Sequence, residues 1–480
     1  MLAKSKRTKS HQDDVHNEVP ASEGILSQPM TRRQAISTVG KAVVGVVVVA
    51  AVAGGGYYAY TSLGPSAPSN VKLDFTAWDY GVDTIKDNLN QFMAKFPKDQ
   101  VTLNDIAYSD YFSGMTQRFS AKTPTDVSYV GEDWLAGWAA SNYLVPVQDI
   151  WDSYTTNKKF SDYVNDMTPF SKICITYNGK IYGLPYYSDT FNFMYNKKMF
   201  NDNNISVPQT WDDVTAAAKK LQGAGIKYPY CQSFQGLSPF DFYQIFSGAM
   251  GNGATLLDSS NAPTFNPSAG DPFYDQIQWT VNGIHKDNII NPDYTALTEA
   301  DIVKKMTGGE VAMTLLAKYN LAAMNAPGSS PAAGNFSLAL MPGKTHVAYG
   351  FAKMYSMTKM AQDRGHDAIQ GAISLIEFFG ANDSTVLKRW AVENGLGFGF
   401  NSPFSDPDIQ TSLVKYYGSD AATLIPQQFK IAQTIPHPVW FGQWVDFANK
   451  QALLPALRQE IQVADAVDKM SKQAKLLNKP

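Results

Sequence analysis

The chain has 480 residues, 44% of them hydrophobic and 12% aromatic, and a formal net charge of −3. A chain of this length and composition can bury a large core and favours two or more domains. Seven Lys and Arg against four Asp and Glu lie in residues 1–41, which leaves 33 against 39 for the rest. Because nucleic-acid binding needs concentrated positive charge, this mildly acidic body argues against a nucleic-acid partner.

The N-terminal region differs in character from the body. Residues 1–30 contain few large apolar side chains and no hydrophobic periodicity, so we expect a disordered tail. Residues 61–70 read TSLGPSAPSN, a short Ser/Pro/Gly spacer between the preceding apolar stretch and the body.

Residues 31–60 carry the features of an export signal. Arg32 and Arg33, followed by Ile36 and the uncharged stretch 42–60, resemble a twin-arginine signal, with a plain signal anchor as the alternative. At a rise of ~1.5 Å per residue, the uncharged stretch approximately spans the ~30 Å hydrocarbon core of a bilayer. No clear A-x-A cleavage site follows, so we expect a retained anchor, with the tail in the cytoplasm and the body on the extracytoplasmic face.

The chain has two cysteines, Cys174 and Cys231. In an exported protein they could form one disulfide, and two buried free thiols are an equal alternative.

From residue 71 the sequence alternates strand-like and helix-like segments. Strands are predicted at 71–78, 101–107 and 125–130, where β-branched and aromatic residues gather. Helices are predicted between them and after them, with apolar faces at Ile85, Leu89, Phe92, Met93 and Phe96, at Phe112, Met115 and Phe119, and in the segment EDWLAGWAASNYL. This order predicts a mostly parallel sheet covered by helices, with ligands bound beyond the carboxyl ends of its strands.

The same pattern resumes in the second half of the body. Thr210 and Thr298 each precede a helical pattern with Asp three residues on, as in a capping box. A short buried strand, VAMTLL, follows the second of these helices. Long amphipathic helices are predicted at 363–380 and 445–476. Two α/β lobes fit this length.

Catalytic and metal-binding motifs are absent from the sequence. It contains no G-x-S-x-G, H-E-x-x-H, C-x-x-C or P-loop pattern. No metal-ligand spacing connects the histidines, which are His11, His16, His285, His346, His366 and His437. A glycoside hydrolase remains an alternative, since it needs only two acids about 5 to 9.5 Å apart. We expect a binding protein without a cofactor or metal, and not an enzyme.

Four segments together resemble a known family. They are NGKIYGLPYYSDTFNFMYNKKMF (178–200), VPQTWDDV (207–214), GGEVAMT (308–314) and LALMPGKT (338–345). They resemble the extracytoplasmic solute-binding proteins of ABC importers, in particular the sugar-binding cluster that includes maltose-binding protein. The resemblance implies an α/β fold of two lobes, like a Venus flytrap, that captures a sugar in the cleft and delivers it to a permease.

The resemblance also implies where the chain passes between the lobes. Strand crossovers fall near Tyr187, Tyr349 and Phe400. Residues 71–187 with 350–400 would form the first lobe, and residues 188–349 with 401–480 the second.

Sugars present hydroxyl groups and apolar ring faces, which carboxylates and aromatic side chains can bind. By resemblance, the candidate ligand contacts are Trp78, Asp79, Tyr80, Glu132, Asp133, Trp134, Tyr186, Asp189, Phe240, Tyr319, Trp440 and Trp444. Several have structural alternatives: Asp79 and Asp133 could cap helices, and Trp78 could end a strand in the core. Asp189 has no helix to cap and stands alone among aromatic residues.

The candidate loops contain no Lys or Arg, which disfavours an anionic solute. Their acids would also suit a cation, so a polyamine is the alternative solute. The mono- or oligosaccharide itself is not specified by the sequence.

Overall fold

The computed structural model describes residues 71–235 and 239–479. The predicted tail, anchor and spacer of residues 1–70 lie outside this range. Among the described residues, none of the helices has the length and apolar character that crossing a membrane requires.

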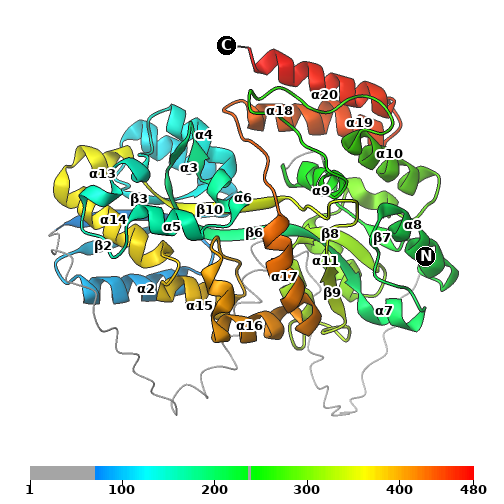
Figure 1. Ribbon diagram of the computed structural model, residues 1–480, viewed down its shortest axis with the longest axis horizontal. Helices are drawn as coiled ribbons and strands as arrows, with labels where there is room; N and C mark the ends of the chain where they lie inside the picture. The colour runs from blue at the N-terminus through cyan, green and yellow to red at the C-terminus, as the bar shows by residue number, and fades with distance from the viewer. Residues whose placement is uncertain (1–70, 236–238, 480) are drawn as a thin grey trace, which may run out of the picture.

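One large sheet runs through the molecule (Figure 1). Its strands are β1 (Lys72–Trp78), β2 (Gln100–Ile106), β3 (Val127–Gly131), β6 (Gly183–Asn196), β7 (Tyr230–Cys231), β8 (Met313–Ala317), β9 (Phe336–Ala339) and β10 (Gly350–Met357). They lie in the order β2-β1-β3-β10-β6-β8-β7, and β9 also pairs with β6. A separate hairpin joins β4 (Thr176–Tyr177) to β5 (Lys180–Ile181).

Strand β6 joins the two parts of the sheet. It pairs with β10 up to Thr190 and with β8 and β9 from Phe191 onward. All its residues are buried except Tyr187, which is partly exposed. A fully buried strand of this length reads as a near-continuous apolar run, which explains the aromatic stretch around Asp189.

The first lobe contains β1, β2, β3 and β10 with their covering helices. These are α2 (Val82–Lys95), α3 (Tyr108–Ala121), α4 (Glu132–Ala140), α5 (Phe160–Asp166), α6 (Pro169–Cys174), α13 (Lys359–Asp363), α14 (His366–Gly380) and α15 (Thr385–Asn394). The predicted alternation of strand and helix is confirmed here. The prediction of a mostly parallel sheet is wrong. Strand β1 runs parallel to β2 and β3, but β10 is antiparallel to both β3 and β6.

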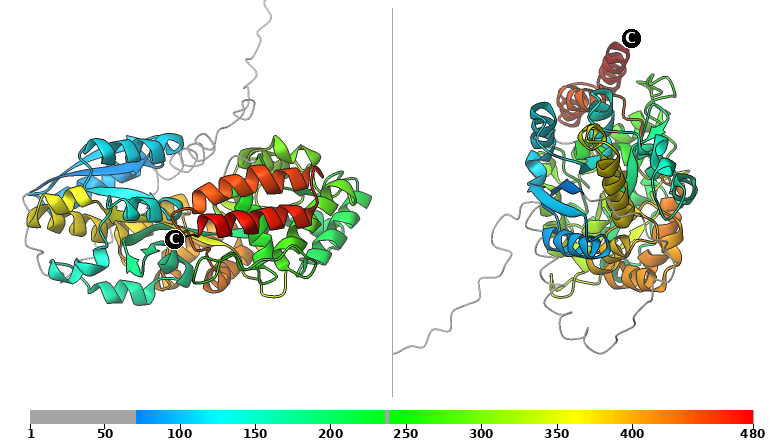
Figure 2. Two further views of the ribbon diagram at one scale, coloured as in Figure 1. Left: turned by 90° about the horizontal axis from the view of Figure 1, so that it is seen from above. Right: turned by 90° about the vertical axis from the view of Figure 1, so that its left-hand side faces the viewer.

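The second lobe contains β7, β8 and β9. Its helices are α7 (Lys197–Asp202), α8 (Trp211–Gly223), α9 (Pro239–Met250), α10 (Pro272–His285), α11 (Glu299–Thr307), α12 (Tyr319–Asn325), α18 (Phe441–Ala448), α19 (Leu454–Leu457) and α20 (Val463–Leu477). The capping boxes predicted at Thr210 and Thr298 are both present. Figure 2 shows α18 and α20 side by side along this lobe.

The two long helices predicted at 363–380 and 445–476 have different outcomes. The first is present as α14, which begins at His366 after Gly365, at φ 89°. The predicted helix 445–476 is divided by a π-helical turn at Asn449–Leu453 and by a break before α20, where Gln459 has φ 59°. Pro455 contributes to the interruption, since it cannot donate a helical hydrogen bond.

Buried hydrophobic side chains form two core clusters. One extends from Phe75 in β1 through Tyr355 in β10 to Leu316 in β8. The other is confined largely to the second lobe and contains Trp211 and Trp444. Helices α16 (Pro407–Tyr417) and α17 (Ser419–Ile431) contact α15 on one side and β9 on the other, so they brace the lobes.

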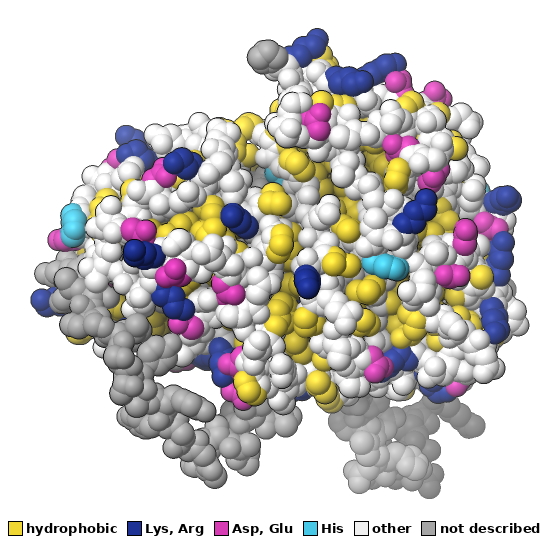
Figure 3. Space-filling model, viewed as in Figure 1, with side chains coloured by type: hydrophobic (Ala, Val, Ile, Leu, Met, Phe, Trp, Pro, Cys, Tyr) yellow, Lys and Arg dark blue, Asp and Glu magenta, His cyan; other side chains and the backbone are white. Residues whose placement is uncertain are grey.

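Cys174 and Cys231 are both free and buried. The disulfide, which the sequence left open, is therefore absent. Charged side chains of both signs are interspersed over the face shown in Figure 3, without a continuous patch of one sign.

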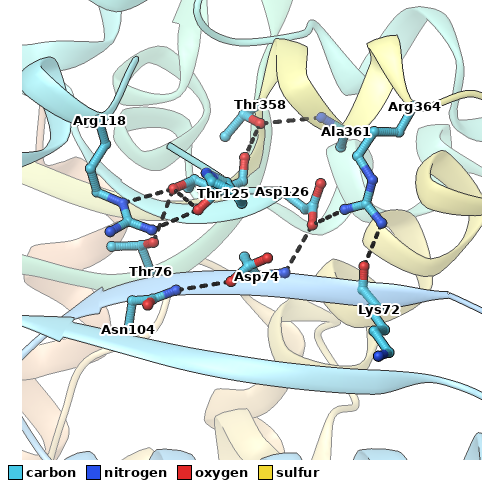
Figure 4. Close-up of polar contacts among 11 residues, drawn as sticks. Lys72, Asp74, Thr76, Asn104, Arg118, Thr125, Asp126, Thr358, Ala361 and Arg364 are labelled. Atoms are coloured by element: carbon cyan, nitrogen blue, oxygen red, sulfur yellow. Dashed lines mark hydrogen bonds and ion pairs between the residues drawn. The ribbon is translucent and has the colours of Figure 1, made fainter. Parts of the chain in front are cut away.

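A buried carboxylate ties β1 and β3 to the helical layer (Figure 4). Asp126 is 1% exposed, accepts a hydrogen bond from the Asp74 N–H at 2.8 Å and pairs with Arg364 at 2.5 Å. Burial raises the pKa of Asp126, and the bond from Asp74 and the Arg364 charge oppose this rise. Arg364 also donates a hydrogen bond to the Lys72 carbonyl, so it connects the start of β1 to Asp126.

Replacing Arg364 by Met should lower the free energy of unfolding by about 2–3 kcal/mol, because it leaves a buried carboxylate without its counter-charge. Urea unfolding followed by circular dichroism measures this. The control is Lys198→Met, which removes an exposed pair with Asp202 and should cost less than about 1 kcal/mol. Equal losses in the two variants would contradict a structural role for the Asp126 pair.

Candidate functional site

The crossing strands place four chemically distinct side chains on one face. Tyr187 lies opposite Lys353, and Asp189 opposite Phe351. Since side chains alternate along a strand, these four share a face of the sheet. The Tyr187 and Phe351 rings are in edge contact at 5.8 Å, and the Lys353 ammonium lies 5.8 Å from the Phe351 ring centroid.

Glu132 and Lys353 form a buried ion pair at the amino end of α4. Their charged atoms are 2.7 Å apart, and the side chains are 3% and 12% exposed. Burial raises the pKa of Glu132 to about 7, against the opposing effect of the Lys353 charge. The pair joins β10 to α4, so it positions the neighbouring Asp133.

Asp133 connects the first lobe to the second. Its Oδ1 accepts a hydrogen bond from the Tyr243 hydroxyl of α9 at 2.6 Å, and His437 Nε2 lies 3.4 Å from the same oxygen. Tyr243 and His437 are also 3.3 Å apart. Burial lowers the pKa of His437 to about 4, so the imidazole is neutral at pH 7. The side chain of Asp133 is 23% exposed, which leaves part of the carboxylate accessible.

Asp189 is fully buried and its two oxygens are engaged. Oδ2 accepts a hydrogen bond from the Tyr187 hydroxyl at 2.6 Å, and Oδ1 accepts one from the Thr190 N–H at 2.8 Å. Burial raises the pKa of Asp189, and the nearby Lys318 charge opposes this rise. Lys318 is itself buried and donates to the Tyr417 hydroxyl at 2.7 Å. A carboxylate and an ammonium thus share one buried environment beside the crossing strand.

A family model described as "Bacterial extracellular solute-binding protein" matches residues 78–384. The chain belongs to this family. The match covers most of both lobes and begins at Trp78, so the resemblance noted from the sequence is confirmed.

Solved structures share the two-lobed fold of this solute-binding protein. Maltose-bound MalE3 of T. maritima has a TM-score of 0.70 and 19% identity, over 85% of this chain and 99% of that chain. The sugar-binding protein MalE of Xanthomonas citri has a TM-score of 0.69 and 16% identity, over 85% and 97%. The substrate-binding protein Lmo0181 of Listeria monocytogenes, in complex with cycloalternan, has a TM-score of 0.68 and 15% identity, over 85% and 98%. At these identities the likeness shows the fold.

Curated relatives match over a shorter stretch. Proteins of Brucella abortus (strain 2308) and Brucella suis biovar 1 (strain 1330), both named as candidate binding proteins, are 25% identical over 135 residues. These residues are 28% of this chain and 31% of the relatives, so the match spans about a third of their length.

The remaining predicted contacts of the solute-binding protein differ in exposure. Trp78 and Tyr186 are 6% and 4% exposed, and their rings pack together at 5.6 Å within an aromatic cluster. Trp134 is partly exposed and stacks on Tyr111. Asp79, also partly exposed, accepts a hydrogen bond from the Tyr108 N–H at 3.0 Å, as a cap would.

Three further predicted residues are aromatic side chains from separate segments. Tyr80 is partly exposed and stacks on Trp390 of α15, within the first lobe. Tyr319, at the start of α12, is partly exposed and donates its hydroxyl to Glu299. Phe240, at the start of α9, contacts Phe191 at 4.7 Å.

The two predicted tryptophans of α18 are arranged differently. Trp440 is the partly exposed N-cap residue of the helix. Trp444 is fully buried in the second-lobe core, and its indole N–H donates to the Met470 carbonyl at 2.9 Å. In this conformation only Trp440 offers surface to a solute.

Sequence reasoning missed Tyr243, His437, Lys353 and Lys318. Tyr243 lies three residues after the predicted Phe240 in an aromatic segment. The two lysines gave a weak signal, since each is a single charge inside an otherwise apolar strand or at its end, in GFAKMYSM and MTLLAK. A lone charge in a buried strand implies a partner, but the partner comes from a distant segment. Among the described residues, no cluster of three or more His, Cys, Asp and Glu side chains could hold a metal ion.

Replacing Lys353 by Met should destabilise the protein by about 3–5 kcal/mol at pH 8, because buried Glu132 loses its counter-charge. The folded-state pKa of Glu132 is raised above its ordinary value, so its protonation favours the folded state as pH falls. The loss should therefore be smaller at pH 5. Urea unfolding at both pH values measures it.

The control for this prediction is the double variant Glu132→Gln, Lys353→Met, which has no titrating carboxylate at this position. The change in its own stability between pH 8 and pH 5 should be much smaller than the change in Lys353→Met. A loss in Lys353→Met that is the same at both pH values would contradict the assigned pairing.

Proposed function

We propose that this solute-binding protein captures a neutral sugar or polyol between its lobes and delivers it to an ABC-transporter permease. The observation that carries the proposal is the Asp133 contact. A partly exposed carboxylate of the first lobe accepts a hydrogen bond from the neutral Tyr243 hydroxyl of the second lobe, beside the neutral His437 ring and the partly exposed Trp134. Hydroxyl groups and apolar ring faces of a sugar would match this combination.

The pairing of charges supports a neutral solute. In the described residues, Lys353 is paired with Glu132, and buried Lys318, which donates to the Tyr417 hydroxyl, lies within the electrostatic influence of Asp189. An anionic solute would need a cation that is not already neutralised. The absence of an available cation therefore favours hydroxyl recognition.

The solved structures with this fold support the same solute class. Their names record maltose, alpha-D-tagatose, cycloalternan, ribitol and D-mannitol as the molecules bound by those proteins. All of these are neutral polyhydroxy compounds.

A cationic solute is the second candidate, because two acidic side chains of the site are partly exposed. Asp79 and Asp133 are both partly exposed, so a polyamine could be attracted to them. Hydrolysis is less well supported, because Glu132 and Asp133 are adjacent on one helical turn and would approach a glycosidic bond from the same side.

The predicted contacts divide by exposure. Those that would touch the sugar directly are partly exposed: Asp79, Tyr80, Asp133, Trp134, Phe240, Tyr319 and Trp440. The buried ones would hold the surrounding structure in place: Trp78, Glu132, Tyr186, Asp189 and Trp444. Closure would be a shift of population toward the arrangement in which both lobes contact the solute.

The proposal extends to location and domain limits. Residues 31–60 would anchor the protein, through a twin-arginine-type signal, with the body on the extracytoplasmic face. The first lobe would comprise 71–187 and 350–400, and the second 188–349 and 401–480. The β6 pairing change at Thr190 and Phe191 supports the first of these limits.

Replacing Asp133 by Asn should weaken sugar binding by about tenfold or more, because a bond to a charged acceptor contributes about 1.5–3 kcal/mol. Tryptophan fluorescence titration with a panel of neutral sugars and polyols measures it, on the full chain in a detergent without a sugar headgroup. Asp202→Asn, an exposed change far from the site, is the control.

A folded wild-type protein that gives no saturable response to any sugar or polyol would contradict the proposed function. A response to spermidine alone would establish the cationic alternative. New reducing ends after incubation with oligosaccharides would establish hydrolysis.

Replacing Asp189 by Ala should weaken binding by about tenfold or more and also lower stability by about 3 kcal/mol, because Lys318 is left buried without its counter-charge. The variant Asp189→Asn, Lys318→Met should recover most of the stability. Calorimetric titration and thermal unfolding measure the two effects separately. Weaker binding with unchanged stability would contradict the buried pairing and indicate a direct contact alone.

A further inference from the structure

Two exposed aromatic side chains lie one turn apart on α3. Tyr108 is 36% exposed and Phe112 is 49% exposed. The other large hydrophobic side chains that are exposed in the described residues are all aliphatic and scattered: Ile173, Val207, Val414, Val439 and Leu476. Because residues four apart share one face of a helix, Tyr108 and Phe112 form a local aromatic surface.

Trp134 extends this surface toward the interlobe site. Its ring is 6.2 Å from that of Tyr108 and 5.9 Å from that of Phe112. It directly follows Asp133, and the Lys353 ammonium lies 5.9 Å from its ring. We call Tyr108, Phe112 and Trp134 the aromatic ledge. The ledge leads from the proposed sugar site outward over α3.

The rings of the ledge are held in place by packing. Phe112 lies parallel to Trp138, at 5.6 Å and an interplanar angle of 7°. The Trp138 indole N–H donates to the Thr116 hydroxyl at 3.2 Å, which fixes its orientation. Tyr108 is in edge contact with Trp78, and its N–H is held by Asp79. Rings fixed before binding lose little conformational entropy when a ligand stacks on them.

We propose that the aromatic ledge is an outer subsite for further units of an oligosaccharide whose first unit lies at Asp133. This inference rests on the proposed function and specifies its substrate class. Trp134, the residue after Asp133, lies 6.2 Å from the Tyr108 ring and 5.9 Å from the Phe112 ring, so the ledge is continuous with the proposed site. The exposed polar residues Ser109, Asp110 and Ser113 are neighbours of the two α3 rings in sequence and offer hydrogen-bonding groups for sugar hydroxyls.

The size and continuity of the ledge favour a sugar over a protein partner. A stable protein interface needs roughly 800 Å² on each partner, far more than the exposed parts of a few rings supply. Aromatic rings with a few polar neighbours, continuous with a pocket, are typical of small-ligand recognition.

The test is a length series of linear gluco-oligosaccharides, from one to six units, in both α-1,4 and β-1,4 linkage. Dissociation constants are measured by isothermal titration calorimetry on the full chain in a detergent without a sugar headgroup. The wild type should bind chains of three or more units more tightly than the monosaccharide. In Phe112→Ala this advantage should fall by about five- to tenfold, while monosaccharide binding stays unchanged.

Two further variants separate stacking from a structural effect. Phe112→Tyr keeps an aromatic ring and should retain the advantage of long chains. Val414→Ala removes an equally exposed apolar side chain on α16 and should change nothing.

The inference is overturned if the wild type does not distinguish chain lengths, or if Phe112→Ala weakens all lengths equally. It is also overturned if Phe112→Ala leaves every dissociation constant unchanged and lowers transport, which would indicate a contact with the permease. Binding of monosaccharides alone would refute the ledge and leave the proposed function intact. The absence of binding by any member, together with no response in the wider panel of sugars and polyols, would refute both.

Discussion

The antiparallel pairing of β6 with β10 is the constraint on which the rest of the structure depends. One strand carries the chain out of the first lobe and the other carries it back, so they run in opposite directions in the middle of the sheet. Their register sets Tyr187 against Lys353 and Asp189 against Phe351. A shift of β6 by one residue would turn Tyr187 and Asp189 to the opposite face, away from Lys353 and Phe351. The hydrogen bonds of this pair therefore fix the composition of the site as well as the connection between lobes.

Charges placed on such a strand are expensive unless they are paired. Lys353 forms an ion pair with Glu132 of α4, and the charge of Lys318, just before α12, acts on Asp189 and opposes the rise of its pKa. Pairs of this kind contribute little net stability, because the cost of removing both ions from water offsets their attraction. Their effect is geometric, since breaking either pair leaves a buried charge. Lys353 thus holds the amino end of α4, and with it Asp133, in a defined place.

Local features of the fold could be predicted from the sequence, and long-range ones could not. The strands at β1, β2 and β3 follow from composition, and the caps at Thr210 and Thr298 from spacing. The direction of β10 could not be predicted, because strand sense depends on which partner it meets.

The same distinction applies to the candidate site. Asp133 and Trp134 were found through the family resemblance and are partly exposed. Tyr243 and His437 reach Asp133 from segments more than one hundred residues away in the sequence. Hydrophobic periodicity describes only local structure, so it could not predict these contacts. Trp444 shows the converse error. It was predicted to contact the ligand because of its segment, but its side chain is fully buried in the core.

The chemistry of the contact between lobes explains why a hydroxyl-bearing solute suits it. Burial keeps the pKa of His437 near 4, so the group formed by Asp133, Tyr243 and His437 carries a single charge at neutral pH. That charge lies in the first turn of α4, where the helix dipole favours an anion. Its donor from the second lobe is a neutral phenol. A sugar hydroxyl could replace or join this donor with little change in electrostatic energy, because one O–H group takes the place of another. A cationic donor could not be exchanged in this way without stranding a charge, so the neutrality of Tyr243 and His437 makes the contact between the lobes responsive to a neutral ligand.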